Sequence, residues 1–149
     1  MAGDAGKLFA LPRCHTDMAT PPALFSSWTP HLQDHWGRTT WDALFLLASD
    51  FPHVRDCADD EPFTPHEVER RRKAWRRILL ALPDALSCPQ CGEHFRRYTE
   101  RRSVDEALRD RDTLMRWLYE AKNEVNRRRK RKSPSFQRVK RRFVPPCRT

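Results

Sequence analysis

Apolar residues recur at helical spacing over residues 36 to 51. They fall three or four positions apart, the spacing that places side chains on one face of a helix. Pro52 follows this stretch, and a proline cannot continue a helix without the loss of a backbone hydrogen bond. The pattern predicts an amphipathic helix that Pro52 closes. Its apolar face consists of Trp41, Leu44, Phe45, Ala48 and Phe51.

A second helix is predicted after residue 63. Thr64, Pro65 and Glu67 are typical of an N-cap, a first helical residue and the acid of a capping box. An apolar face then lies opposite a run of arginines and lysines, and Pro83 and Asp84 end the pattern. The apolar face consists of Val68, Trp75, Ile78, Leu79 and Leu82.

A third helix start is predicted just after the second helix ends. Ser87 is followed by Gln90 three residues later, and Pro89 lies in the first turn, where its missing N–H group costs nothing. This start places Cys88 and Cys91 in the first turn of a helix.

The rest of the chain carries two more helix signals. Ser103 with Glu106 opens a short helical piece, and Asp112 precedes a long apolar stripe at helical spacing. Pro134 limits that helix, with a short terminal turn around Phe136. The predicted fold is therefore all-α, a four-helix bundle plus a short terminal helix, in about 100 residues that can bury one core. The stripe consists of Leu114, Trp117, Leu118, Ala121 and Val125.

Composition and charge divide the chain into three parts. The sequence has 149 residues and a formal net charge of +9, and residues 127–142 contain ten basic residues and no acid. Residues 1–33 hold several prolines without periodicity, which predicts a flexible N-terminal arm. We therefore expect the arm over 1–33, one domain over 34–137 and a basic tail over 138–149.

The sequence disfavours a membrane-spanning protein and a secreted one. Its longest apolar stretch, Ala43 to Ala48, is far shorter than the roughly 20 residues of a membrane-spanning helix. Residues 1–30 lack the apolar region of a secretory signal peptide. Four glycines and few β-branched runs also disfavour an all-β fold.

Among the five cysteines, only Cys88 and Cys91 are close in sequence. At a helix N-terminus, unpaired N–H groups and the helix dipole favour a thiolate, which is the species that attacks disulfides. The Cys-x-x-Cys pair therefore predicts a redox dithiol. A zinc site is the alternative, because His94 follows Cys91 by three residues. It needs a second ligand pair, and the candidates, His53 with Cys57 or a lone Cys147, do not form a familiar zinc knuckle.

Several short motifs occur in a fixed order along the chain. They are Trp-Gly-Arg-Thr-Thr-Trp-Asp-Ala-Leu at 36–44, Phe-Pro at 51–52, Cys-Pro-Gln-Cys-Gly-Glu-His-Phe at 88–95, Trp117, and Asn-Glu-Val-Asn at 123–126. In this order and spacing they resemble the Erv/ALR sulfhydryl oxidases, in particular the short viral members. The resemblance implies a helical bundle that encloses FAD and forms a homodimer. It also implies an FAD-dependent thiol oxidase that passes electrons from protein dithiols through the Cys-x-x-Cys pair and FAD to molecular oxygen, giving hydrogen peroxide.

The resemblance further implies roles for single residues. Cys91 would lie beside the flavin ring as the charge-transfer thiolate, and Cys88 would exchange with incoming dithiols. His94 would stack near the flavin, unless it is an ordinary surface histidine. The amides of Asn123 and Asn126, three residues apart on one helix, would meet adenosine and ribose, unless that face is solvated. The implied cofactor-binding set is Gly37, Arg38, Trp41, Phe45, His94, Trp117, Lys122, Asn123, Val125, Asn126 and Lys132.

Two positions depart from the family pattern. Phe45 and Lys122 stand where the family commonly has histidine. A phenyl ring still provides an apolar wall, whereas a lysine supplies a cation suited to phosphate and loses the aromatic stack. Lys132 is the residue that we expect near the pyrophosphate, and for Trp41 core packing and flavin contact are both expected.

The remaining cysteines do not form the second pair that many family members use to relay electrons. Cys14 and Cys147 are each candidates for a one-thiol relay, for a disulfide partner or for an unpaired surface thiol. We assign Cys57 no function. Ala107 occupies the position where some members carry a cysteine of a structural disulfide.

The resemblance implies protein dithiol substrates, such as thioredoxin-like or virion proteins. It implies a location in the host cytoplasm or the virion, or in the mitochondrial intermembrane space. The rival hypothesis is a zinc-containing nucleic-acid-binding protein that uses the basic tract together with Cys88, Cys91 and His94. Such a tract is also typical of a nuclear localisation signal or a solvated helix end. The flavin motifs outweigh the tract, so we expect no metal, no membrane and at most weak nucleic-acid binding.

Overall fold

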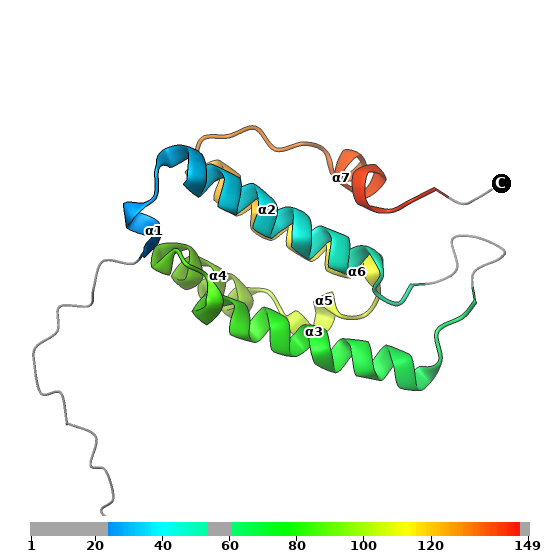
Figure 1. Ribbon diagram of the computed structural model, residues 1–149. Coiled ribbons are helices and arrows are strands. Elements are labelled where there is room, and N and C mark those ends of the chain that lie inside the picture. The colour runs from blue at the N-terminus through cyan, green and yellow to red at the C-terminus, as the bar shows by residue number, and fades with distance from the viewer. Residues whose placement is uncertain (1–23, 54–60, 147–149) are drawn as a thin grey trace, which may run out of the picture.

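The computed structural model of the protein describes residues 24–53 and 61–146. Within these ranges every regular element is a helix, so the all-α prediction is confirmed (Figure 1). In this part of the chain, no helix is both long enough and apolar enough to cross a membrane. The helices are α1 (Leu24–Ser27), α2 (Pro30–Ser49), α3 (Pro65–Ala85), α4 (Pro89–Arg101), α5 (Val104–Ala107), α6 (Arg111–Arg128) and α7 (Phe136–Phe143).

Four long helices pack in two pairs. Helix α2 lies along α6, and α3 lies along α4, with the short α5 joining the second pair to α6 (Figure 1). Helix α7 packs against both α2 and α6. The side chains between the pairs form one core, whose largest fully buried members are Phe45, Phe51, Leu79, Leu108, Leu114, Met115 and Leu118. A four-helix bundle with a short terminal helix is therefore the observed architecture.

Two of the predicted helix caps are confirmed. Thr64 and Glu67 form the reciprocal capping box of α3, with the Glu67 N–H group donating to Thr64 Oγ1 and the Thr64 N–H group donating to Glu67 Oε2. Ser103 caps α5 by accepting the Glu106 N–H group. Both caps satisfy N–H groups that a helix start leaves unpaired.

Other predicted boundaries were wrong by a few residues. Helix α2 begins at Pro30 after an N-cap at Thr29, earlier than the apolar pattern indicated. The N-cap of α4 is Cys88 rather than Ser87, and the N-cap of α6 is Asp110 rather than Asp112. In each case a side chain nearer the true start accepts the N–H group, so the apolar pattern alone does not locate the cap.

The basic C-terminal segment folds back onto the bundle. Helix α6 ends at Arg128, and Lys130 has a positive φ of 53°, so the chain turns before Lys132. Helix α7 then runs across the predicted boundary at 137/138. Its Phe143 ring stacks on the Phe45 ring at 5.2 Å between centroids. Segment 24–33 of the predicted arm forms α1 and the start of α2, while residues 1–23 lie outside the description. The predicted domain boundaries stay predictions.

Candidate active site

The Cys-x-x-Cys pair forms a disulfide at the N-terminus of α4. The Cα atoms of Cys88 and Cys91 are 5.1 Å apart, and Pro89 occupies the first helical position. Cys88 is the N-cap, and its Sγ accepts the Cys91 N–H group at 3.1 Å. This N–H group and the helix dipole stabilise a thiolate at Cys88 when the disulfide is reduced. Cys88 is 6% exposed, whereas Cys91 is partly exposed.

A close backbone contact fixes the disulfide relative to α3. A Cβ atom built on Gly92 would lie 2.3 Å from the carbonyl oxygen of Pro83. No real Cβ atom tolerates such a distance, and the obstacle is backbone rather than a flexible side chain. Glycine at position 92 is therefore required for α4 to pack this closely against α3, and it sets the position of the adjacent Cys91.

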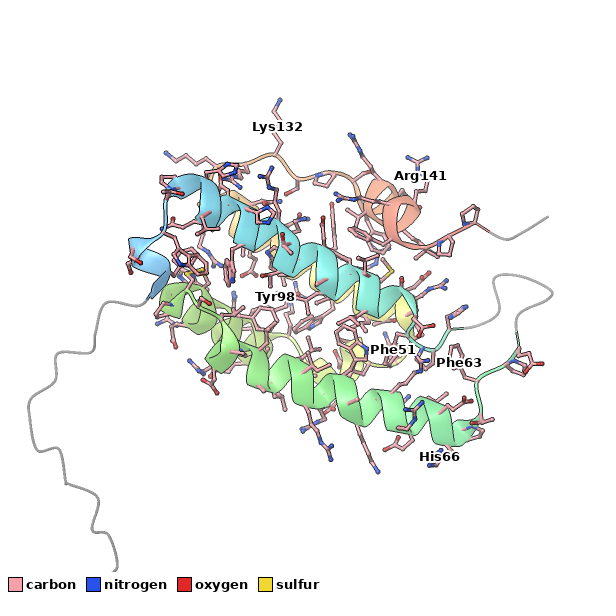
Figure 2. All side chains as sticks on the ribbon, viewed as in Figure 1. Phe51, Phe63, His66, Tyr98, Lys132 and Arg141 are labelled. Atoms are coloured by element: carbon pink, nitrogen blue, oxygen red, sulfur yellow. A yellow bond between two sulfur atoms is a disulfide. The ribbon has the colours of Figure 1, made fainter. Side chains whose placement is uncertain are left out.

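The disulfide opens into a cavity of about 430 Å³ between α2, α4 and α6. Ligand pockets in proteins have volumes of roughly 300–1,000 Å³, so a cofactor of moderate size fits the space. Tyr98, which Figure 2 shows between the two helix pairs, forms part of the lining, and its hydroxyl donates to the Trp117 carbonyl oxygen at 2.9 Å. The apolar part of the wall consists of Trp41, Leu44, Leu82, Leu86 and Phe95.

The rest of the cavity wall is strongly cationic. Among the residues described, Glu124 is the single carboxylate in the lining, and Arg101 pairs with it at 2.9 Å. Because the positive charges are in excess, the cavity favours a ligand that carries negative charge. The cationic lining consists of Arg38, Lys122, Arg128, Arg129 and Arg131.

Asp34 holds two of these arginines at the cavity. It accepts hydrogen bonds from Arg129 at 2.9 Å and from Arg131 at 2.7 Å, across 95 and 97 residues of chain. The hydrogen bond from Arg131, with further attraction to both guanidinium groups, lowers the pKa of the Asp34 carboxyl group. The start of α2 is thereby joined to the segment that follows α6.

His94 also lines the cavity, one turn after Cys91. Burial lowers the pKa of its imidazole, and the charges of Arg128 and Arg97 lower it further. The ring is therefore neutral at neutral pH, since an ordinary histidine already titrates near 6.5. A neutral imidazole can stack on an aromatic ligand without adding to the positive charge of the wall.

The structure brings most of the sequence-predicted residues to this one cavity. Phe45, Trp117, Asn123 and Lys132 do not line it. Phe45 is fully buried behind the wall, and Trp117 packs beneath Phe95 and Tyr98. Lys132 is exposed, and Figure 2 shows it pointing away from the bundle. The predicted residues that line the cavity are Gly37, Arg38, Trp41, Cys88, Cys91, His94, Lys122, Val125 and Asn126. The functional role of each stays a prediction.

One buried polar atom beside the cavity fits a bound ligand. The side-chain oxygen of Asn123 has no hydrogen-bond partner in the described part of the chain, although it is buried. Buried acceptors are normally paired, so this oxygen on α6, between the cavity residues Lys122 and Glu124, is available to a donor from a ligand or a water molecule. Asn126, one turn later, lines the cavity and donates to Ser133 Oγ at 3.2 Å. Together with the cationic wall, these amides fit the phosphate, ribose and base groups of FAD.

Sequence reasoning missed part of the cavity wall. Arg129 and Arg131 line it, whereas the sequence had pointed to Lys132. Phe25 and Gln33 also line it, although both fall in the predicted arm. Gln33 Nε2 donates to the carbonyl oxygen of Phe25 at 3.0 Å, which ties α1 to α2. The Thr-Pro pair that starts α2 is the sequence signal that reveals this extension of the bundle.

The zinc alternative involves cysteines both inside and outside the described residues. Residues 24–53 and 61–146 contain no group of three or more histidine, cysteine, aspartate or glutamate side chains that could hold a metal ion. Cys14, Cys57 and Cys147 lie outside the described residues, so the relay and disulfide roles considered for Cys14 and Cys147 stay predictions.

Comparison with known proteins gives a family and a fold. The model of the Erv1 / Alr family matches residues 38–144. No curated protein matches the sequence significantly. The chain resembles the yeast Erv1 core, with 20% identity and a TM-score of 0.54 over 89% of this chain and 92% of that one. It also resembles the FAD-binding domain of Erv1 from Saccharomyces cerevisiae, with 21% identity and a TM-score of 0.54 over 74% and 91% of the two chains. At these identities the structures establish a shared fold, and the resemblance to short viral members stays a prediction.

Proposed function

The chain belongs to the Erv1 / Alr family, and from this premise we propose that it is an FAD-dependent thiol oxidase that forms disulfide bonds in substrate proteins. The observation that carries the proposal is one cavity with two kinds of wall. The Cys88–Cys91 disulfide opens into it, and Arg129 and Arg131 line it as well. The first wall supplies thiol–disulfide exchange, and the second suits a cofactor with phosphate groups.

The chain's own chemistry in this proposal is disulfide exchange at the N-terminus of α4. The family resemblance assigns the exchange with substrate to Cys88, although Cys88 is the less exposed of the two cysteines in the disulfide form. A substrate thiolate attacks its Sγ atom, so the Cys88–Cys91 bond breaks and Cys91 leaves as a thiolate. The second substrate thiol then attacks the mixed disulfide, which releases oxidised substrate and leaves both cysteines reduced. The Cys91 N–H group that now contacts Cys88 Sγ stabilises the Cys88 thiolate as it leaves.

The remaining cavity residues hold the cofactor in this proposal. Arg129 and Arg131 would take the pyrophosphate in place of the expected Lys132. The amide of Asn126, which lines the cavity, would take the adenosine and ribose groups together with the buried amide of Asn123, which does not line it. Trp41, His94 and Val125, which line the cavity, would contact the flavin, and Phe45 and Trp117 are buried behind that wall. Bound FAD would supply the two-electron transfer from the reduced cysteine pair to oxygen, with hydrogen peroxide as product.

The proposal is tested by the visible spectrum and oxygen consumption of the purified protein. We expect bound flavin, and oxygen consumption with dithiothreitol that Cys88→Ser and Cys91→Ser each abolish. Cys57→Ser is the matched control and retains activity. Cys88→Ser leaves a lone Cys91 thiolate and gains a long-wavelength absorbance that Cys91→Ser lacks. Protein that takes up no flavin on addition would rule the proposal out, and equal loss in all three variants would give the cysteines a structural role.

We also infer that the protein is a homodimer through the outer face of α2. Leu46 and Leu47 on this helix are 58% and 57% exposed, which is unfavourable for two adjacent large apolar side chains. A second copy that covers them would remove this surface from water. Light scattering should give twice the chain mass, and Leu46→Glu with Leu47→Glu should give a monomer. Leu80→Glu on α3 is the control and keeps the dimer.

A further inference from the structure

Lys122 is a half-buried cation that forms no ion pair with the described residues. It lies on α6, lines the cavity, and its Nζ atom sits 5.7 Å from the centroid of the Phe45 ring. No hydrogen bond or ion pair joins Lys122 to any part of the chain that the structure describes. A charge removed from water normally finds a partner, so an unpaired ammonium at a cavity wall indicates that the partner comes from a ligand.

The nearby carboxylate is already engaged by another residue. Asp42 on α2 acts on Lys122 through space, but its Oδ2 atom accepts a hydrogen bond from Arg142 at 2.7 Å. Arg142 lies on α7. Its neighbour Phe143 stacks on the Phe45 ring, which the Lys122 ammonium group also approaches. One turn of α7 therefore supports Phe45 and holds Asp42.

We propose that Arg142 is a positioning residue for the cofactor: by holding Asp42 in an ion pair, it keeps the Lys122 ammonium free to bind a negatively charged or acceptor group of FAD. The inference rests on the proposed function for the identity of this ligand. According to this inference, α7 contributes to cofactor recognition, although it is far from the disulfide along the chain. Arg142 itself does not line the cavity, so it influences the ligand only indirectly, by pairing with Asp42 and by its charge near Lys122.

The electrostatic environment of Lys122 supports this arrangement. Burial lowers the pKa of its ammonium group, the charge of Arg142 lowers it further, and Asp42 opposes both. If Arg142 loses its charge, Asp42 becomes available to Lys122 and competes with the ligand for it. The same loss has little effect on folding, because the Arg142 side chain is 64% exposed and exposed ion pairs contribute little.

The test is a fluorescence titration of cofactor-free protein with FAD. Arg142→Gln should bind FAD about tenfold more weakly, and Lys122→Met should lose FAD affinity to a similar degree. A loss of about this size is expected when one interaction between partly solvent-screened charges is removed. Arg141→Gln, the exposed neighbour without an ion pair in the described structure, is the control and should match the unaltered protein. The double variant Asp42→Asn with Arg142→Gln should recover the affinity, because it removes the competing carboxylate.

A second readout does not need the cofactor. The pKa of Lys122, followed by NMR in cofactor-free protein, should rise in Arg142→Gln and stay near its original value in the double variant. Unchanged FAD affinity in Arg142→Gln would overturn this inference and leave the proposed function standing. A double variant that binds as weakly as Arg142→Gln would overturn it as well, since Arg142 would then act through the fold alone. Absence of FAD binding by the unaltered protein would instead overturn the proposed function and remove the ligand named here.

Discussion

The two ends of the cavity are held by different kinds of interaction. At the disulfide end, backbone contacts fix the geometry: Cys88 caps α4, and Gly92 packs against the Pro83 carbonyl group. At the cationic end, ion pairs between exposed side chains fix the geometry, because Asp34 pairs with Arg129 and Arg131. Overpacking against a fixed backbone costs about 1–3 kcal/mol, whereas an exposed ion pair is worth about 0–1 kcal/mol. The sulfur atoms of the Cys88–Cys91 disulfide are therefore fixed rigidly, and the cationic groups remain adjustable by salt and pH.

The largest effect is expected from a methyl group at the disulfide end. Gly92→Ala places a Cβ atom against the Pro83 carbonyl oxygen, which forces α4 away from α3 and lowers the free energy of unfolding by about 2 kcal/mol. Denaturant unfolding measures this loss. Gly37→Ala is the control. Its new Cβ atom would lie 3.9 Å from the nearest atom of the described structure, Arg129 Nη1, which is an ordinary van der Waals contact. Alanine in helix α2 should therefore raise the free energy of unfolding by about 0.5–1 kcal/mol. Equal changes in the free energy of unfolding for the two variants would mean that the disulfide end is packed no more tightly than the cationic end.

The next effect concerns ligand binding at the cationic end. Arg129→Gln with Arg131→Gln removes two cations from the cavity wall and should weaken FAD binding about tenfold or more. Lys130→Gln with Lys132→Gln removes the same net charge from exposed positions outside the wall and should change FAD affinity little. A flavin titration of both variants measures the difference. If the lysine variant loses more affinity, the pyrophosphate contact belongs to Lys132 as the sequence predicted.

A smaller effect should depend on pH. Arg131 and Arg129 lower the pKa of the Asp34 carboxyl group, so the ion pairs stabilise the folded protein above the ordinary carboxyl pKa of 3.8. That contribution is lost as the pH falls through the lowered pKa of the folded state. Asp34→Asn should therefore melt at a lower temperature than the unaltered protein at pH 7, and the difference should disappear in strong acid. A difference that persists in strong acid would mean that the Asp34 charge is not its cause.

The smallest effect is expected for nucleic acid. Much of the basic tract is paired with acids of the bundle, as in the pairs Lys140–Asp112 and Arg142–Asp42. Other basic residues of the tract, such as Lys132 and Arg141, point outward without an acidic partner among the described residues (Figure 2). Binding to a DNA duplex should be weak and fall steeply between two salt concentrations, because it rests on counterion release. Tight, sequence-selective binding would revive the nucleic-acid hypothesis.

The helices were predictable because their apolar faces follow the helical period. The starts of α2, α3 and α4 are marked by a different signal, a proline at the first helical position. Thr64-Pro65 was interpreted correctly as N-cap and first helical residue, and Pro89 also occupies the first helical position, which makes Cys88 the cap. Thr29-Pro30 carries the same signal, yet its position among other prolines favoured the interpretation as an arm.

The cationic wall was less predictable than the disulfide. Cys88 and Cys91 lie within one helical turn, so local spacing is sufficient to place them together. The choice among Arg129, Arg131 and Lys132 depends instead on where α6 ends, and a continuous run of basic residues contains no local signal for that end. Arg129 and Arg131 both donate hydrogen bonds to Asp34, and contacts across 95 and 97 residues cannot be derived from local pattern.

The contacts of Asp34 also bear on how the protein is made. During synthesis α2 and α4 emerge before Arg129 and Arg131 have been added to the chain, so the cavity wall is incomplete until the bundle is nearly finished. Contacts this distant in sequence also form late in folding, because closing a long loop costs entropy first. Once the wall is complete, any ligand that binds there stabilises the folded chain by mass action. Under the proposed function that ligand is FAD, so cofactor-free protein is expected to unfold more readily than the FAD-loaded form.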